Sequence, residues 1–141
     1  MASTINNDMK EYLSNFYIPK LTAYEFLKCF FAFLKKGNHT EIERDISDFL
    51  YAQKQIEQNS IVLKEIKFRS NGIYWYSNDV EDALFNLQNG GLLGKMNPSF
   101  GIILIKYTDE EVEKIISDAP ADYVSVIEKI AKTYINKNDL N

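Results

Sequence analysis

Cysteine and histidine are almost missing from this chain of 141 residues, and their scarcity excludes several kinds of chemistry. Cys29 is the only cysteine and His39 the only histidine, so the chain alone cannot form an internal disulfide or an ordinary zinc site. Secreted proteins of this size often use disulfides, so the single cysteine favours a reducing cytoplasm. The sequence therefore predicts a cytoplasmic protein with no structural metal and no cofactor.

Long apolar runs are also missing. The longest are Cys29–Leu34 and Phe100–Ile105, whereas a membrane-spanning helix needs ~20 predominantly apolar residues. The first ten residues are polar and lack the charged-then-apolar order of a secretion signal. The sequence therefore predicts no membrane partner.

Catalytic and nucleotide-binding motifs are missing as well. Cys29 begins the most apolar run of the chain, which argues against an activated thiolate. The glycine-rich stretch Gly90–Lys95 is not a P-loop, because Asn89 takes the place of the first glycine and Met96 that of the Ser or Thr. An enzyme whose acidic residues assemble only in the folded chain stays open as the least favoured hypothesis.

The composition itself is that of an ordinary soluble globular protein. Apolar residues make up 45% of the chain and charged residues 26%, and the formal net charge is -4. This length predicts one domain over residues 1–141, with mobile ends at 1–7 and 138–141. Lysines outnumber arginines 14 to 2, which is typical of an AT-rich genome such as that of a low-GC bacterium or a mobile element.

Apolar residues recur at helical spacing in several segments. One face of a predicted helix, which ends before Pro19, carries Met9, Tyr12, Leu13, Phe16 and Tyr17. Thr22 and Glu25 form a capping box for a helix that is apolar nearly all round to about Lys36, and such a helix is usually central. A second box at Thr40–Glu43 predicts another helix that runs to about residue 58–60.

Strands are predicted between the helices. Residues 61–69 alternate, with Val62 and Ile66 on one side and Leu63 on the other, and Asn71-Gly72 predicts a tight hairpin turn into residues 73–76. Further strands are predicted at residues 92–93 and 100–107, the latter covered on both faces. Helices are predicted at 78–89, after Thr108 and after Pro120. The residues expected to be buried together are Phe30, Phe33, Phe49, Leu84, Leu87, Ile103 and Ile105.

The order of these elements over residues 22–107 resembles that of winged-helix domains embedded in a longer helical protein. The predicted fold class is therefore α+β: mostly helical with a small antiparallel sheet, and a winged-helix-like core with flanking helices. In DNA-binding winged helices the helix at 78–89 would be polar and basic. Here it carries Asp79, Glu81 and Asp82 and no lysine or arginine. The resemblance therefore favours a protein-binding module over a DNA-binding one.

Tryptophan, tyrosine and arginine cluster only at the predicted hairpin, and these side chains most often anchor protein interfaces. The predicted partner-binding residues are Arg69, Tyr74, Trp75, Tyr76 and Lys95. Period-two alternation places Ile73 and Trp75 on one face of the hairpin and the two tyrosines on the other, so one face needs a cover. That cover is either the helix before Pro19 or a partner.

Three functions follow, in order of preference. The first is a non-enzymatic module that binds another protein or itself. The second is a winged-helix DNA-binding regulator or antitoxin-like protein, whose nucleic-acid-binding residues would be Lys64, Lys67, Arg69 and Lys95. The third is the enzyme described above.

Overall fold

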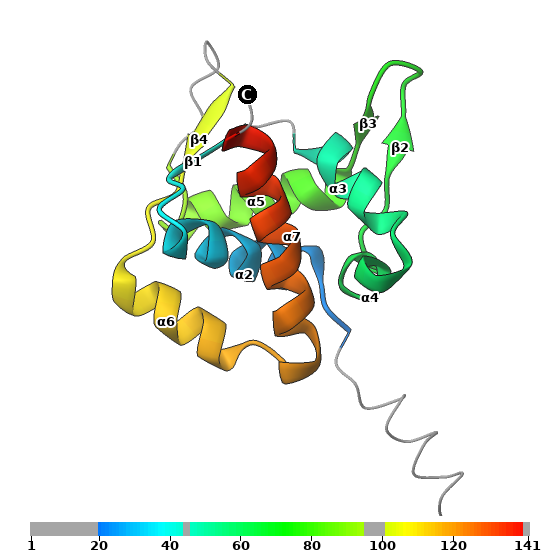
Figure 1. The fold of residues 1–141 in the computed structure, drawn as a ribbon. Coiled ribbons are helices and arrows are strands. Elements are labelled where there is room, and N and C mark those ends of the chain that lie inside the picture. The colour runs from blue at the N-terminus through cyan, green and yellow to red at the C-terminus, as the bar shows by residue number, and fades with distance from the viewer. Residues whose placement is uncertain (1–19, 44–45, 95–100, 140–141) are drawn as a thin grey trace, which may run out of the picture.

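Helix α2 (Ala23–Lys36) is the central element of the fold, as its apolar sequence predicts. The computed structural model describes residues 20–43, 46–94 and 101–139. In these residues α2 packs against three other helices, α5 (Asn78–Asn89), α6 (Asp109–Asp118) and α7 (Ala121–Asp139) (Figure 1). Its buried side chains include Phe26, Leu27 and Phe30, each with no exposed surface. The fold is α+β and mostly helical, which confirms the predicted class.

Local capping fixes where several helices begin. The Thr22 hydroxyl oxygen accepts a hydrogen bond from the Glu25 amide at 3.1 Å, and the hydroxyl donates to the Glu25 carboxylate at 3.0 Å. Thr108 and Glu111 form a complete capping box at the start of α6. Ser77 caps α5 through the amide of Val80. At each of these starts a side-chain oxygen accepts from a backbone amide that the first helical turn leaves unpaired. The three predicted starts are confirmed.

The predicted helix from Thr40 to about residue 60 is wrong at its start and at its end. Residues Glu41–Glu43 form strand β1, which pairs antiparallel with β4 (Ile102–Leu104), with Ile42 opposite Ile103. Both isoleucines are 1% exposed, so the pairing buries apolar surface that a local capping box cannot. The helical part begins later, as α3 (Ser47–Lys54), and a 3-10 turn, η1 (Glu57–Asn59), follows it.

The predicted strand at 61–69 is also wrong over most of its length. Residues Ser60–Leu63 form the short helix α4, and only Arg69–Ser70 are extended, as β2. Val62 and Ile66 are four residues apart, a spacing that fits one face of a helix as well as one face of a strand. The alternation predicts Leu63 on the opposite side from Val62, whereas in α4 both residues are fully buried.

The strand predicted at 100–107 is shorter than expected and is covered on one face. Ile103 and Ile105 are buried, whereas Ile102 and Leu104 are 37% and 47% exposed. Leu93 forms an isolated antiparallel bridge with Ile105 on the edge of β4 away from β1. One face of this small assembly lies on the core, and the other is exposed.

The predicted core is confirmed. All seven residues named from the sequence are buried in one cluster with the apolar faces of α2, α5 and α7. In α7 the buried residues include Tyr123, Ile127 and Tyr134, at the spacing the sequence indicates. The helix predicted before Pro19 and the mobile end at 1–7 lie outside the described residues. Of the end at 138–141, Asp139 closes α7, and residues 140–141 lie outside.

Candidate interaction surface on the hairpin

Strands β2 (Arg69–Ser70) and β3 (Trp75–Tyr76) form an antiparallel hairpin that projects from the helical body (Figure 1). Arg69 is opposite Tyr76, and Ser70 is opposite Trp75. The four residues 71–74 connect the strands, so the loop is twice as long as the predicted tight turn. We call residues 69–76 the hairpin.

Asn71 organises the loop through its side chain. Its Oδ1 accepts hydrogen bonds from the amides of Ile73 and Tyr74, at 2.9 and 3.0 Å. Of Asn71 and Gly72, which both tolerate positive φ, only Gly72 adopts it, at 91°. The Asn71 side chain thus holds the loop in a turn by binding the backbone amides, so a second residue with positive φ is not needed.

The loop presents apolar surface to solvent. Ile73 is 89% exposed and Tyr74 is 42% exposed. Tyr74 and Tyr76 lie edge to face with ring centroids 6.5 Å apart, so they share one side of the hairpin as the alternation predicts. The tip is therefore an exposed isoleucine and tyrosine on a loop with a defined hydrogen-bonding pattern.

The base of the hairpin is fixed to α3. The indole of Trp75 stacks on the ring of Tyr51, with centroids 3.8 Å apart and planes 11° from parallel. The Trp75 amide donates to the Asp48 carboxylate at 2.6 Å. Tyr51 in turn packs edge to face on Phe68, at 5.7 Å between centroids. Helix α3 thus covers the hairpin at Trp75, whereas Ile73 at the tip stays exposed.

Three of these supporting residues are absent from the sequence-based site: Asp48, Tyr51 and Phe68. The sequence predicts a helix at Asp48 and Tyr51 and a strand at Phe68, and neither prediction brings these residues to the hairpin. The sequence does contain one indication that Tyr51 contacts another element: it is a large aromatic residue directly after the apolar residues Phe49 and Leu50. An aromatic residue beside a complete stripe often contacts a neighbouring element.

The basic residues proposed for nucleic acid do not form one strand surface. Arg69 is exposed in strand β2 of the hairpin. Lys67 is exposed two residues before it, and the Lys67 amide donates to the carboxylate of Asp79 in α5 at 2.9 Å. Lys64 is exposed in the turn after α4, outside the hairpin strands. Lys95, predicted for both kinds of partner, lies outside the described residues.

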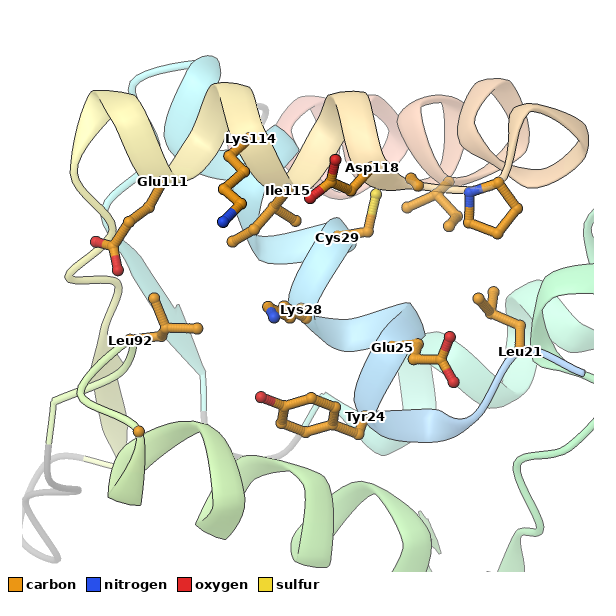
Figure 2. Close-up of a pocket in the computed structure, with 14 residues that line it drawn as sticks. Leu21, Tyr24, Glu25, Lys28, Cys29, Leu92, Glu111, Lys114, Ile115 and Asp118 are labelled. Atoms are coloured by element: carbon orange, nitrogen blue, oxygen red, sulfur yellow. The ribbon is translucent and has the colours of Figure 1, made fainter. Parts of the chain in front are cut away.

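A groove lies elsewhere, between α2, α6 and the residues that follow α5. Its volume is about 520 Å³. Figure 2 shows Lys114 pointing from α6 into this space and the Cys29 sulfur pointing from α2 toward α6. Burial raises the pKa of the Cys29 thiol to about 12, so at neutral pH it is a protonated, unreactive side chain. Sequence reasoning found no groove here, because its walls come from segments far apart in the chain.

Metal-ligating side chains do not gather in the part of the chain that the structure describes: no group of three or more His, Cys, Asp or Glu residues there could hold an ion. His39 is half-buried, with its ring centroid 5.7 Å from that of Tyr134. Within the same residues, no helix is both long and apolar enough to cross a bilayer.

Comparison with protein-family models, with curated proteins and with solved structures found no significant match to this chain.

Proposed function

We propose that this protein is a non-enzymatic interaction module of the cytoplasm, which binds another protein or a second copy of itself through the hairpin. The observation that carries the proposal is the exposed tip, where Ile73 and Tyr74 project from a loop held by Asn71. An exposed isoleucine alone is common on protein surfaces. An isoleucine and a tyrosine side by side on a projecting, braced loop have the form of an interface anchor.

The bracing at the base supports the same function. Ordering a flexible loop during binding reduces affinity, and a loop held before binding avoids that loss. Here the Tyr51–Trp75 stack and the Asp48 hydrogen bond hold the base, and the Asn71 side chain holds the tip. Arg69 and Tyr76 pair at the base of the hairpin and add a charge and a hydrogen-bonding group there. The partner we propose therefore offers an apolar pocket with an acidic rim.

The order of elements supports a winged-helix arrangement. Helix α2, strand β1, helix α3, helix α5, the extended residue Leu93 and strand β4 follow one another in the order of such a domain. In this proposal α5 is its third helix, and the segment from η1 to β3 is an insertion between the second and third helices. The hairpin is then an addition to the domain, available for a partner.

The exposed side of α5 favours a protein partner over DNA. It presents Glu81, Asp82 and Phe85, of which Phe85 is 62% exposed. Carboxylates on that side would repel the phosphates of a duplex. A DNA-binding regulator remains the second candidate because Lys64, Lys67 and Arg69 are all exposed.

The lysine-rich composition supports an origin in a low-GC bacterium or a mobile element.

Self-association is tested first, by sedimentation velocity over a range of concentrations. The variants are Ile73→Asp at the tip and, as a matched control, Ile61→Asp on α4, where the isoleucine is 48% exposed. If the chain self-associates through the hairpin, Ile73→Asp dissociates the oligomer and Ile61→Asp does not. Equal behaviour of the two variants in an associating chain contradicts the proposal.

If the chain is monomeric at all concentrations, a photoreactive amino acid at position 73 tests for another protein. The control places the same group at Glu113, an exposed position on α6. The proposal expects one dominant cross-linked protein from position 73 in the source cell, abolished by Tyr74→Asp. A cross-linking pattern identical to that from position 113 contradicts it.

A further inference from the structure

Strand β1 pairs with β4 along one edge only. The Ile105 amide donates to the Thr40 carbonyl at 2.8 Å, and Ile42 is opposite Ile103. Hydrogen-bonded and non-hydrogen-bonded residues alternate along an antiparallel strand, so Thr40 and Ile42 are the residues that bond to β4. The backbone groups of the two glutamates in β1 therefore point away from β4, along a second edge.

Most of the backbone groups on this second edge have no partner. The Glu43 amide donates to the Tyr134 hydroxyl at 3.3 Å. Within residues 20–43, 46–94 and 101–139, the N–H and C=O of Glu41 and the C=O of Glu43 make no hydrogen bond. Both glutamates are exposed. An exposed strand edge with unpaired backbone groups is a place where another strand can add to the sheet.

The side chains on the outer face of β1 are acidic. Glu41 is opposite Leu104 and Glu43 is opposite Ile102, and all four residues are exposed. Neither carboxylate has an ion pair or a hydrogen bond in the part of the chain that the structure describes. On a strand added beside β1, the residues opposite the two glutamates would be their cross-strand neighbours, and opposite charges stabilise such pairs.

The inner side of the same edge adjoins a hollow. Its volume is about 360 Å³, and its walls include His39 and Tyr134. Tyr134 belongs to the buried cluster that also contains Ile42. Successive side chains of a strand point to opposite faces, so the residue opposite Ile42 on an added strand would point toward Tyr134. The edge therefore fits three residues in the order basic, apolar, basic.

We propose that the free edge of β1 binds an extended segment of another protein with the pattern basic–apolar–basic, by addition of a strand. The backbone of that segment pairs with the free groups of Glu41 and Glu43, and its basic side chains pair with their carboxylates. A second copy of β1 does not fit, because it would place the same carboxylates opposite each other.

This site goes beyond the proposed function and is independent of it. The β1–β4 pair lies across the body from the hairpin (Figure 1). Its inner face carries the buried Ile42 and Ile103, so the same pair contributes to the core and leaves one edge open. A partner on the hairpin tip and a strand on β1 can therefore be bound together.

The test is an NMR titration of the full chain with the peptide acetyl-Thr-Lys-Val-Lys-Thr-amide. The matched control is the same peptide with every backbone amide N-methylated, which keeps both charges and donates no backbone hydrogen bond. The first peptide should shift the amide resonances of Glu41 and Ile42 and slow the hydrogen exchange of the Glu41 amide. The N-methylated peptide should bind about tenfold more weakly or less, and a peptide with glutamates in place of both lysines should also lose about tenfold or more.

Two variants at one position separate the backbone from the charge. Glu41→Pro removes the outward amide and the carboxylate and leaves the bonds to β4, because proline is tolerated where a strand N–H faces solvent. It should weaken binding of the lysine peptide about tenfold or more. Glu41→Ala keeps the amide and should weaken binding only about two- to fivefold. Ile73→Ala, at the hairpin tip, should leave the affinity unchanged.

Several results overturn the proposal. Equal affinity for the lysine peptide and its N-methylated form means that charge alone attracts the peptide. Equal affinities of Glu41→Ala and Glu41→Pro mean that the outward amide is not used. A dimer of the native chain that Glu41→Pro dissociates means that a second copy occupies the edge. If urea denaturation shows that Glu41→Pro is unfolded, the two peptides with the native chain still decide. None of these results bears on the hairpin, because the Ile73 variants test that surface separately.

Discussion

The structure contains two antiparallel strand pairs of the same hydrogen-bonding type, and the two differ in what they bury. The β1–β4 pair joins segments far apart in the sequence and buries Ile42 and Ile103 on the core, each 1% exposed. The β2–β3 pair joins neighbouring residues and has no buried side chain in either strand. Because burial and not pairing supplies most of the stabilisation, the first pair belongs to the folding core. The second is held from its base and is free to carry function.

The largest expected effect separates the two pairs by stability. Ile103→Ala removes buried apolar volume and should lower the free energy of unfolding by about 2–4 kcal/mol. Ile73→Ala, at the exposed tip of the other pair, should change it by less than about 0.5 kcal/mol. Urea denaturation followed by circular dichroism measures both. Similar losses of stability in the two variants would mean that the hairpin tip is packed in the native protein, which would contradict the difference between the two strand pairs.

The next expected effect concerns how the hairpin is attached. Tyr51→Ala removes the ring on which Trp75 stacks and should cost about 1–2 kcal/mol of stability, from lost area and lost stacking. It should also shift Trp75 emission to longer wavelength, because water reaches the indole. Tyr51→Phe keeps the stacked ring and is the matched control, with unchanged emission. If Tyr51→Phe shifts the emission as much as Tyr51→Ala does, the stack is not what holds Trp75.

The same comparison explains which parts of the fold could be predicted from the sequence. Helices such as α2 and α5 are specified locally, because Thr22 and Ser77 cap them and a 3.6-residue apolar stripe follows. The buried residues on these helices, such as Phe30 and Leu84, could be predicted for the same reason. Strand β1 could not be predicted, because Thr40–Glu43 has the local pattern of a helix start. Its extended form depends on Ile103, which comes much later in the chain.

The candidate site also has parts that local sequence predicts and parts that depend on contacts between distant residues. The sequence predicts Tyr74, Trp75 and Tyr76 as contact residues because large aromatic residues cluster there. It does not predict the 89% exposure of Ile73, because it places Ile73 in a strand after a two-residue turn and not in a four-residue loop. The support from Asp48 and Tyr51 depends on how α3 packs beside the hairpin, and no local pattern encodes that contact. The groove beside Cys29 was missed for the same reason.

A smaller effect tests whether the hairpin loop is held by one side chain. Asn71→Ala removes the acceptor for the amides of Ile73 and Tyr74 and should weaken the loop by about 1 kcal/mol. Hydrogen exchange of those two amides should become faster, while the core amides around Ile103 keep their protection. Asn71→Asp keeps an acceptor oxygen and should preserve the slow exchange. Faster exchange throughout the protein would contradict the separation of the two strand pairs.

The smallest expected effect is on nucleic acid, and it separates the two candidate functions. A labelled duplex at physiological salt should show no specific complex, because the exposed side of α5 carries Glu81 and Asp82 where phosphates would approach. The double variant Lys64→Glu/Lys67→Glu should then change nothing. The reverse experiment sharpens the test, because Glu81→Lys/Asp82→Lys replaces the carboxylates of α5 with amines. If α5 is the third helix of a winged-helix arrangement, this variant should gain weak binding that falls steeply with salt. A nanomolar complex of the native chain, lost in Lys64→Glu/Lys67→Glu, would instead make the DNA-binding regulator the better account.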